Sequence, residues 1–368
     1  MRDSLVPSAT LIFPAVNQLA ADYWRAAQQR GERTVAAASV AADVSLFNGT
    51  AVVSLPTIYE RDFPAAFLAL IAEHSIARIH CSVASVYAFL RQFCIDQRLT
   101  IELLGDSPIH QQMSQHQRLM ARARQLRPLV IACADVSKVL PELEIAAVFR
   151  QSALIYGESN DEKLAAMMGI VASAPAGDVV ELGSLMGRTA FVLLYLSRRY
   201  CLGPLLTVDP WLPANAVHRD SPEAIRSLVD DWDYDALAEA FFVNLAPFVG
   251  SDHAHLRMPS AQAFPVYAEG CPILSQDARA VPYCRRIAIL HIDANHDYDA
   301  VRNDCDLWLR RLLPGAWLIL DDYVWSHGDG PLRVGNELIE EYAERIERAF
   351  VCGKALFMKF RGDANREE

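Results

Sequence analysis

The chain has 368 residues, of which 52% are hydrophobic and 21% are charged, and its formal net charge is −11. This length is sufficient for two domains with buried cores, and the composition is that of a globular rather than a disordered protein. The negative charge and the lack of a run of Lys and Arg argue against a nucleic-acid partner, because neutralising phosphates requires clustered cations.

Cysteine spacing and apolar runs bear on where the protein acts. The eight cysteines include no C-x-x-C pair, so neither a zinc site nor a disulfide framework is predicted. No apolar run reaches membrane-spanning length, and the N-terminus lacks an apolar stretch followed by a small-residue cleavage site. We therefore expect a soluble, cytoplasmic protein without a membrane partner.

The first third of the chain alternates strands with helices, which predicts a parallel α/β sheet. The expected strands are Thr10–Val16, Arg33–Val40, Ala51–Leu55, Ala77–Cys81 and Thr100–Leu103. The helices expected between them are Gln18–Arg30, Phe63–His74 and Val83–Gln97. We expect a smaller Rossmann-like α/β domain over residues 1–128.

Three segments of this first unit carry a resemblance: Phe13–Gln18, Leu55–Tyr59, and Ser107-Pro108 leading into the helix Gln111–Leu126. They resemble the pre-ATP-grasp domain, the Rossmann-like N-terminal domain of ATP-grasp ligases. The ATP-binding domain of such a ligase does not follow, so the resemblance implies an accessory domain for substrate or subunit contact. The alternative is a packing module without a ligand, because the first strand-to-helix turn has no glycine to admit a phosphate.

Residues 129–155 are expected to be a helical linker. Leu129–Cys133 is followed there by the helix Pro141–Gln151. A second domain is expected over residues 156–368, opening with the helix Asp161–Ala172, for which Asn160 or Ser159 is suited as the N-cap.

The strand-turn-helix junction at Val179–Ala190 is the most informative motif. An apolar run ends in Glu181, and Gly183 and Gly187 follow four residues apart before an apolar helix. Such a turn lets backbone approach a nucleotide-like ligand, but it lacks the third glycine of a dinucleotide fingerprint and the Gly-Lys-Ser/Thr of a P-loop. Glu181 would repel a pyrophosphate and tolerate a cationic sulfonium with an amino-acid tail. The turn therefore favours S-adenosylmethionine, bound by Glu181, Gly183, Ser184 and Gly187.

Two further segments complete the expected cofactor site. The strand Leu205–Val208 ends in Asp209, about twenty residues past the glycines, where a carboxylate is placed to accept hydrogen bonds from ribose hydroxyls. The strand His255–Met258 is followed by Ser260, which we expect near the adenine. Ser260 is equally suited to cap a helix.

Carboxylates follow two later strands of the same expected sheet. Asp293 comes directly after the strand Ile287–Ile292, and Asp321 and Asp322 come directly after the strand Trp317–Leu320. Ligands of α/β sheets bind at the carboxyl ends of the strands, so these side chains are expected at one edge. Adjacent carboxylates repel each other, and a divalent cation relieves that repulsion. The three carboxylates therefore predict a hard-oxygen site for Mg²⁺.

These segments together carry a second resemblance. Val179–Ala190, Asp209–Trp211, Asp293–Tyr298 and Leu313–Tyr323 resemble the class I S-adenosylmethionine-dependent methyltransferases. The closest group is the metal-dependent sugar O-methyltransferases of macrolide biosynthesis, of the mycinamicin and macrocin type. The resemblance covers about residues 155–360 and implies a C-terminal Rossmann-like, seven-stranded methyltransferase sheet.

The resemblance also implies roles for individual residues. In this family the acids matching Asp293, Asp321 and Asp322 bind Mg²⁺, and in the mycinamicin branch a histidine matching His296 is the catalytic base. The Asp-x-x-His spacing fits that branch, although its acidic pair begins with Glu where this chain has Asp321. In the macrocin-like alternative Asp293 is the base, so the choice between His296 and Asp293 stays open. An aliphatic hydroxyl is a poor nucleophile at neutral pH, which is why both a metal and a base are needed.

Two regions are candidates for enclosing a substrate. Leu212–Asp233 is either a lid or a solvated acidic loop, and it contains Pro213, Asp220, Pro222, Glu223, Asp230, Asp231 and Asp233. Tyr323, Trp325 and His327 follow the acidic pair and form either a stacking wall for a sugar ring or part of the core.

We therefore expect a two-domain O-methyltransferase that uses S-adenosylmethionine and Mg²⁺ on a hydroxyl of a sugar or glycosylated metabolite. It is expected to act as a homo-oligomer in natural-product or polysaccharide biosynthesis. One alternative is a catechol-type or other small-metabolite methyltransferase. Another is a non-catalytic S-adenosylmethionine-binding subunit of a biosynthetic complex, against which the three carboxylates and His296 argue. The sequence predicts neither the acceptor and its methylated position nor the role of the first domain.

Overall fold

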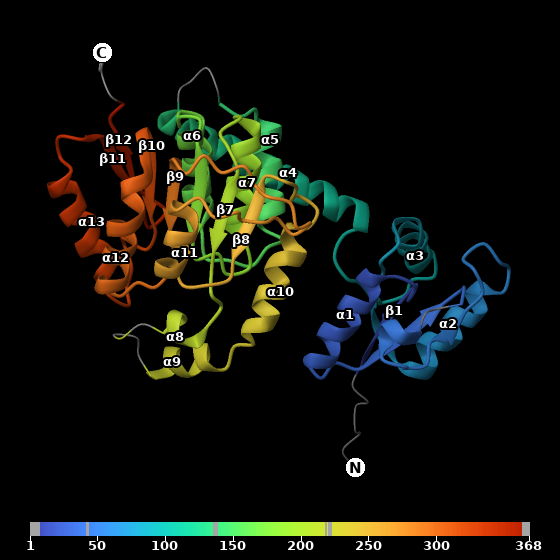
Figure 1. Cartoon of the computed structure of the whole chain (residues 1–368). Coiled ribbons are helices and arrows are strands. Elements are labelled where there is room, and N and C mark those ends of the chain that lie inside the picture. The colour runs from blue at the N-terminus through green and yellow to red at the C-terminus, as the bar shows by residue number, and fades with distance from the viewer. Residues whose placement is uncertain (1–7, 42–43, 135–138, 218, 220–222, 363–368) are drawn as a thin grey trace. The chain divides into compact units, whose positions relative to one another are not determined.

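The computed structural model describes residues 8–41, 44–134, 139–217, 219 and 223–362. The chain divides into two compact units, Met1–Arg118 and Leu119–Glu368, each built around one sheet (Figure 1). Within the described residues, no helix combines the length and the apolar character needed to cross a membrane.

The first unit is built on a parallel sheet of five strands in the order β3-β2-β1-β4-β5. Its strands are β1 (Ala9–Ile12), β2 (Thr34–Ala38), β3 (Val53–Ser54), β4 (Ile76–His80) and β5 (Glu102–Leu103). Its helices are α1 (Gln18–Gln29), α2 (Phe63–His74) and α3 (Ala84–Asp96), with a short 3-10 turn at Val44–Phe47. The expected Rossmann-like α/β fold is confirmed.

An apolar layer packs against each face of this first sheet. Residues that alternate along β1 serve opposite layers, Leu11 in one and Ile12 in the other. The layer with Leu11 is rich in aromatic rings, and Phe63 stacks on Phe67 with centroids 5.2 Å apart. At the start of α1 the Asn17 side chain accepts a hydrogen bond from the Ala20 N–H, so a side chain caps this helix.

The second unit contains a sheet of seven strands in the order β11-β12-β10-β9-β6-β7-β8, in which only β12 runs antiparallel to its neighbours. Its strands are β6 (Asp178–Leu182), β7 (Leu205–Val208), β8 (His253–Leu256), β9 (Ile287–Ile292), β10 (Leu312–Leu320), β11 (Ile346–Cys352) and β12 (Ala355–Phe360). The expected seven-stranded Rossmann-like sheet is confirmed. Two strand boundaries differ from expectation, since β8 begins two residues before His255 and β10 extends back to Leu312.

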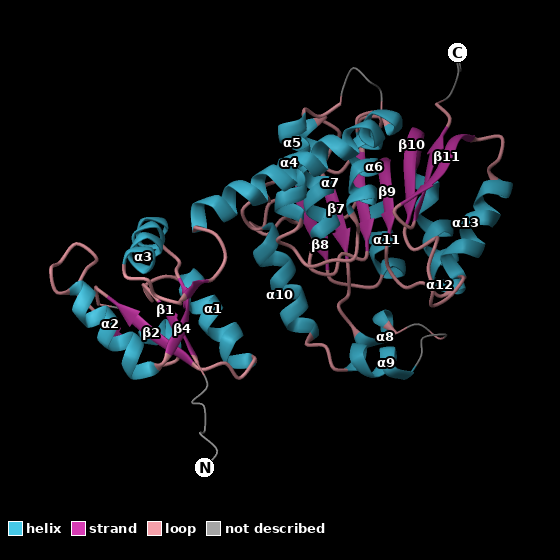
Figure 2. Cartoon of the chain, turned by 180° about the vertical axis from the view of Figure 1, so that it is seen from behind, coloured by secondary structure: helices cyan, strands magenta, loops and turns pink. Residues whose placement is uncertain are grey.

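Helices cover both faces of this sheet (Figure 2). One layer holds α4 (Pro108–Cys133), α5 (Glu142–Ser152), α6 (Asp161–Val171), α7 (Arg188–Arg199) and α10 (Tyr234–Leu245). The other holds α11 (Ser260–Ala268), α12 (Tyr298–Trp308) and α13 (Gly330–Glu341), and the short helices α8 (Pro213–Ala216) and α9 (Glu223–Asp230) follow β7. Val179 packs in the first layer and Val180 in the second, as the alternation of a buried strand requires.

The segment expected to be a linker, residues 129–155, lies within α4 and α5 where it is described. Helix α4 continues through Pro128 to Cys133. Val130, Ile145 and Phe149 are buried in the same core as α6 and α7. Because its apolar face packs into the second unit, this segment belongs to that unit, which begins at Leu119.

The strand order reverses at β6, which lies between β9 and β7. The turns that follow β6 and β9 touch there, and the Asp293 N–H donates to the Leu182 carbonyl at 2.8 Å. Gly183 has a φ of +82°, and a Cβ at this position would overlap the backbone carbonyl of Asp293. Only glycine therefore allows the two turns to approach so closely.

Gly183→Ala is expected to destabilise the second unit by about 3 kcal/mol, because it adds a backbone clash to the cost of a positive φ. Gly315→Ala is the matched control, since Gly315 has a φ of +80° but its added Cβ would meet only Pro175 Cδ at 3.9 Å. The control should cost about 1 kcal/mol. Urea unfolding measures both variants, and equal losses would contradict the importance of the contact between the turns.

Candidate active site

A cavity of about 540 Å³ opens at the carboxyl edge of the second sheet, where the strand order reverses. This is the place at which open α/β sheets bind ligands. Its walls include eight of the ten side chains predicted for the site: Gly183, Ser184, Asp209, Ser260, Asp293, His296, Asp321 and Asp322. Glu181 and Gly187 do not line it.

Glu181 lies beneath the glycine turn rather than in the cavity. It is fully buried, accepts a hydrogen bond of 2.9 Å from Ser184 Oγ, and lies 3.1 Å from His291 Nδ1. Direct contact with a ligand, as expected from the sequence, does not fit this placement. Glu181 is the fourth residue of the buried strand β6, and its side chain supports the glycine turn through the hydrogen bond from Ser184.

Gly187 closes the same turn. Its N–H donates to the Ser184 carbonyl at 2.7 Å, and it is the N-cap of α7 with a φ of +91°. A Cβ there would press on the Phe241 ring at 3.0 Å. Gly187 is therefore explained by the turn and its packing.

Asp209 joins the turns that follow β6 and β7. Its Oδ2 accepts hydrogen bonds from the Ser184 and Leu185 N–H groups at 2.9 and 3.1 Å, and its Oδ1 accepts one from the Trp211 N–H at 2.9 Å. Burial raises the pKa of this carboxyl, although the three N–H donors oppose the rise. A carboxylate offers about four acceptor positions, so Asp209 can also accept from a ribose hydroxyl in the cavity.

Ser260 does not cap a helix, because the N-cap of α11 is Pro259. It is the first residue of α11, and its Oγ accepts a 2.8 Å hydrogen bond from Trp308 Nε1 of α12. It also bonds to Asp304, whose pKa burial raises to about 6. Ser260 therefore ties α11 to α12 while one side of it faces the cavity.

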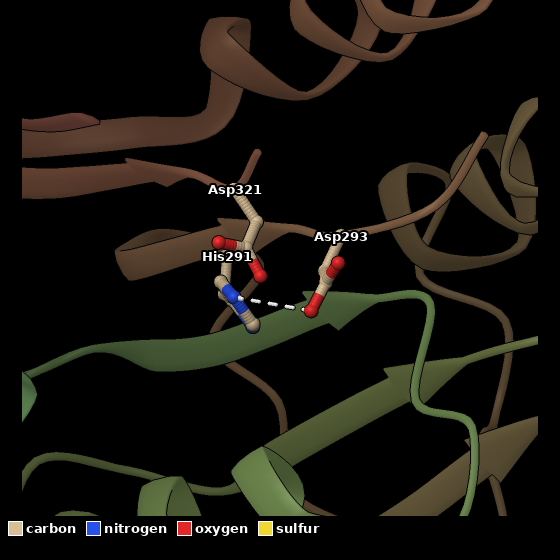
Figure 3. Close-up of side chains that lie close together, drawn as sticks. All are labelled: His291, Asp293 and Asp321. Atoms are coloured by element: carbon tan, nitrogen blue, oxygen red, sulfur yellow. Dashed lines mark ion pairs between the residues drawn. The ribbon is translucent and has the colours of Figure 1, made fainter. Parts of the chain in front are cut away.

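Of the three predicted carboxylates, Asp293 lies between the other two. Its ligand atoms lie within 4.8 Å of those of His291 and Asp321 on one side and of those of His296 and Asp322 on the other. Figure 3 shows the first of these groups, with the ion pair between His291 and Asp293 marked. Each group of oxygen and imidazole donors has a composition that a divalent cation can use.

Two lysines that the sequence analysis did not single out reach the same carboxylates. Lys163 of α6 is fully buried, its Nζ pairs with Asp321 Oδ2, and it lies 3.6 Å from Asp293 Oδ2. Lys354 Nζ lies 2.6 Å from Asp322 Oδ1. Lys163 follows the charged Asp161 and Glu162 at the start of α6, so the sequence pattern gives no sign that its side chain is buried.

The pKa values of Asp293 and Asp321 shift in opposite directions. Withdrawal from water and the neighbouring Asp321 raise the pKa of Asp293 well above its usual range. Burial also opposes ionisation of Asp321, but the attraction of Lys163 outweighs it and holds the pKa of Asp321 below its usual range. The cluster therefore has more carboxyl groups than its lysines neutralise.

His296 faces this cluster from the turn after β9. Its Nε2 lies 3.8 Å from Asp293 Oδ1 and 3.6 Å from Asp322 Oδ2. Burial lowers the pKa of His296, although Asp322 and Asp321 oppose the change. The imidazole is therefore neutral at neutral pH and able to accept a proton.

The aromatic residues after β10 have two different surroundings. Trp325 lines the cavity and meets the His296 ring edge-on with centroids 4.8 Å apart, and His327 lines the cavity beside it. Tyr323 packs against the core instead, and its hydroxyl donates to Asn336 Oδ1 at 2.7 Å. Trp325 and His327 thus line the cavity, whereas Tyr323 does not, and stacking against a sugar ring stays a prediction.

The segment that follows β7 covers part of the cavity. Its apolar and amide side chains line the cavity, namely Leu212, Asn215, Ala216, Val229, Trp232 and Tyr234. Its acidic residues Glu223, Asp230, Asp231 and Asp233 are exposed, and Asp220 and Pro222 lie outside the described residues. Asn295 Nδ2 donates at 3.1 Å to the Asn215 and Val217 carbonyls and so joins this segment to the turn after β9. Both features expected of it, a cover and an acidic surface, occur together.

Comparisons with known proteins point in the same direction. Residues 180–323 match the model of a family described as a methyltransferase domain. A search of curated proteins finds no match.

Similar solved structures include the O-methyltransferase NovP, at 16% identity over 53% of this chain and 81% of that chain with a TM-score of 0.39. CalS11, a TDP-rhamnose 3′-O-methyltransferase of calicheamicin biosynthesis, is similar at 14% identity over 59% and 77% with a TM-score of 0.32. MycE of the mycinamycin pathway, in complex with Mg, SAH and mycinamycin VI, is similar at 14% over 52% and 46% with a TM-score of 0.30.

The seven-stranded sheet and the cavity at its reversal point define the second unit as a Rossmann-like methyltransferase fold. Residues 180–323 of the second unit match the methyltransferase domain model, which supports methyl transfer as its chemistry. The sequence-based resemblance to class I methyltransferases is confirmed.

Two histidines beneath the Asp209 turn generate a prediction about acid stability. The Thr207 hydroxyl lies 3.0 Å from His253 Nε2 and 2.9 Å from His255 Nδ1. Burial lowers the pKa of His253 to about 4 and that of His255 to about 3. Because the folded pKa values lie below the unfolded value, the stability linked to each histidine is complete above about pH 6.5 and is lost as the pH falls towards 4. At pH 5 the loss should be about 2 kcal/mol for each ring.

The measurement is urea unfolding between pH 7.5 and pH 5. His255→Phe should lower the stability at pH 7.5, because the bonds of His255 to Thr207 and to the Asp209 carbonyl are lost. It should also flatten the pH dependence by about half, since one of two titrating rings is gone. A parent and a variant with the same pH slope would contradict the assignment.

Proposed function

We propose that the second unit is an S-adenosylmethionine-dependent O-methyltransferase that uses a divalent cation and acts on a hydroxyl of a sugar or glycosylated metabolite. The observation that carries the proposal is the meeting of two sites in one cavity. The Gly183 and Asp209 turns lie on one side of it, and the Asp293, Asp322 and His296 cluster lies on the other.

The cofactor side of the cavity suits a nucleoside with a cationic tail. Asp209, Ser260, Gly183 and Ser184 line this side. Asp209 and Ser260 would contact the ribose and the adenine, and the Gly183-Ser184 backbone would meet the amino-acid end. Carboxylates beside this turn disfavour the phosphates of NAD or ATP, and no dinucleotide or P-loop motif is present in the sequence. When bound, S-adenosylmethionine supplies an electrophilic methyl group.

The acidic side of the cavity suits a hard divalent cation. Burial, followed by the neighbouring Asp321, raises the pKa of Asp293, and three carboxyl groups here face two ammonium groups. Oxygen donors are the ligands that Mg²⁺ prefers. When bound there, Mg²⁺ would lower the pKa of an acceptor hydroxyl and so assist its deprotonation.

His296 is the proposed base because its neutral imidazole lies at the edge of this cluster. The wall of Trp325 and His327 would orient a sugar ring beside it, and the segment around Trp232 would exclude water. Asp293 is the alternative base. Its distance to the Lys163 ammonium, 3.6 Å, favours a holding role over proton transfer.

Titration with S-adenosylmethionine in the presence and absence of Mg²⁺ tests the cofactor. We expect binding in both conditions, because the glycine turn is formed by the fold, and far weaker binding of NAD and ATP. Chelation should remove methyl transfer, and added Mg²⁺ should restore it. Full turnover in excess chelator, or NAD binding of equal strength, would count against the proposal.

His296→Ala is expected to lower kcat by about 10²–10⁴ while leaving the affinity for S-adenosylmethionine nearly unchanged. Because burial lowers the pKa of His296, the acid limb of kcat in the parent should lie below the ordinary histidine value of about 6.5. The pH profile of kcat and the thermal stability of both proteins decide the role. A variant that loses stability and activity together would make His296 structural, and one of full activity would make Asp293 the base.

A further inference from the structure

Lys163 is the most unusual residue of the second unit. Its side chain has no exposed surface, although lysines are almost never fully buried unless they are paired. Its ammonium pairs with Asp321 and lies 3.6 Å from Asp293. A buried ammonium of this kind is expensive to desolvate, and it is retained only where the surrounding charges compensate it.

The backbone around Lys163 fixes the position of its side chain. The Lys163 N–H donates to the Asn160 cap at 2.9 Å, which sets the first turn of α6. The turn between β11 and β12 lies directly against this residue: a Cβ at Gly353 would lie 2.5 Å from Lys163 N and 2.8 Å from Lys163 Cβ. The backbone and the Cβ of Lys163 are therefore held in place, and the rest of its side chain is fully enclosed.

The backbone of Asp321 is fixed as well. Its N–H donates to the Ile292 carbonyl at 2.9 Å, so its backbone is joined to β9 while its carboxylate faces Lys163. A divalent cation that shared this carboxylate would come close to a buried ammonium of the same sign. In a site of low polarity such repulsion is strong.

Asp322 has a different kind of partner. Lys354 lies in the two-residue turn Gly353-Lys354 between the paired residues Cys352 and Ala355, and its side chain is 35% exposed. That ammonium can move into water at small cost, whereas Lys163 cannot. The Asp293 side chain is 26% exposed and likewise faces the cavity.

We propose that Lys163 is a built-in counter-cation that engages Asp321, so that Asp293 and Asp322 alone supply the carboxylate ligands of the divalent cation. Asp321 and Lys163 are then positioning residues that act through Asp293. Two carboxylates are enough for Mg²⁺, which usually keeps several waters. This inference rests on the cation site of the proposed function and removes one of the three carboxylates expected from the sequence as a ligand.

The test exchanges each ion pair for neutral residues in the full chain and titrates the proteins with MgCl₂. Lys163→Met with Asp321→Asn removes one positive and one negative charge, so it leaves the net charge of the cluster unchanged. Its Mg²⁺ affinity should stay within about threefold of the parent. The matched control, Lys354→Met with Asp322→Asn, makes the same change in charge but removes a ligand, and it should weaken Mg²⁺ by at least about tenfold.

The single variant Lys163→Met supplies a second readout. It removes the ammonium group that faces Asp293 and Asp321, so this variant should bind Mg²⁺ about tenfold more tightly than the parent. Its Tm should fall by about 10 °C without cation, and the double variant should recover most of that loss. Arg122→Met serves as the control on ion pairing elsewhere around α6, because Arg122 pairs with Asp161 and Glu162 at a partly exposed site and should change neither quantity appreciably.

The outcomes separate this inference from the proposed function. If the folded Lys163→Met, Asp321→Asn protein loses Mg²⁺ as the control does, Asp321 is a ligand and the inference is overturned while the cation site stands. If this double variant fails to fold, the single variant Lys163→Met decides: tighter Mg²⁺ binding than in the parent supports the inference, and equal or weaker binding overturns it. If the parent binds no Mg²⁺, the cation part of the proposed function fails. The Tm values then decide the role of Lys163: recovery in the double variant supports it, and no recovery overturns it.

Discussion

The structure of the second unit depends on the close approach of two turns at the point where its strand order reverses. Gly183 and the carbonyl of Asp293 lie so near each other that no side chain fits between them. This contact places the end of β6 beside the end of β9. The Asp209 side chain joins the end of β7 to the same place by accepting hydrogen bonds from the Ser184 and Leu185 N–H groups. The cofactor side and the acidic side of the cavity are adjacent because these turns are adjacent.

A second constraint is the amount of charge gathered at this edge. Three aspartates, two lysines and His296 occupy a small, largely buried volume, and each additional unpaired charge there costs several kcal/mol. Ion pairs between these side chains, rather than exposure to water, compensate for most of the charges. Three carboxyl groups thus face two ammonium groups, and the proposed cation site rests on this imbalance.

The sequence predicted the parts of this arrangement that periodicity and strand-end position control. The first sheet and strands β6 to β10 of the second followed from apolar segments, whereas β11 and β12 were expected only through the family resemblance. Asp293, Asp321 and Asp322 followed from their places after Ile292 and Leu320. Glu181 was misplaced because a residue within a strand can face either into the sheet or towards its edge, and the pattern does not distinguish the two.

Lys163 escaped the sequence analysis for a different reason. Its partner Asp321 is 158 residues away along the chain, and nothing near Lys163 indicates that an acid will meet it. The same holds for Lys354, which reaches Asp322 only because a tight turn between two antiparallel strands carries it there. Contacts of this kind become visible only when the chain is folded.

The turn Gly353-Lys354 also has a consequence for how much of the chain makes up a working unit. The region that matches the methyltransferase family ends at residue 323, before this turn, and begins at residue 180, after Lys163. A fragment limited to those residues would contain all three aspartates and neither lysine. The electrostatic balance of the site is therefore a property of the elements that flank the matched region, α6 on one side and the last hairpin on the other.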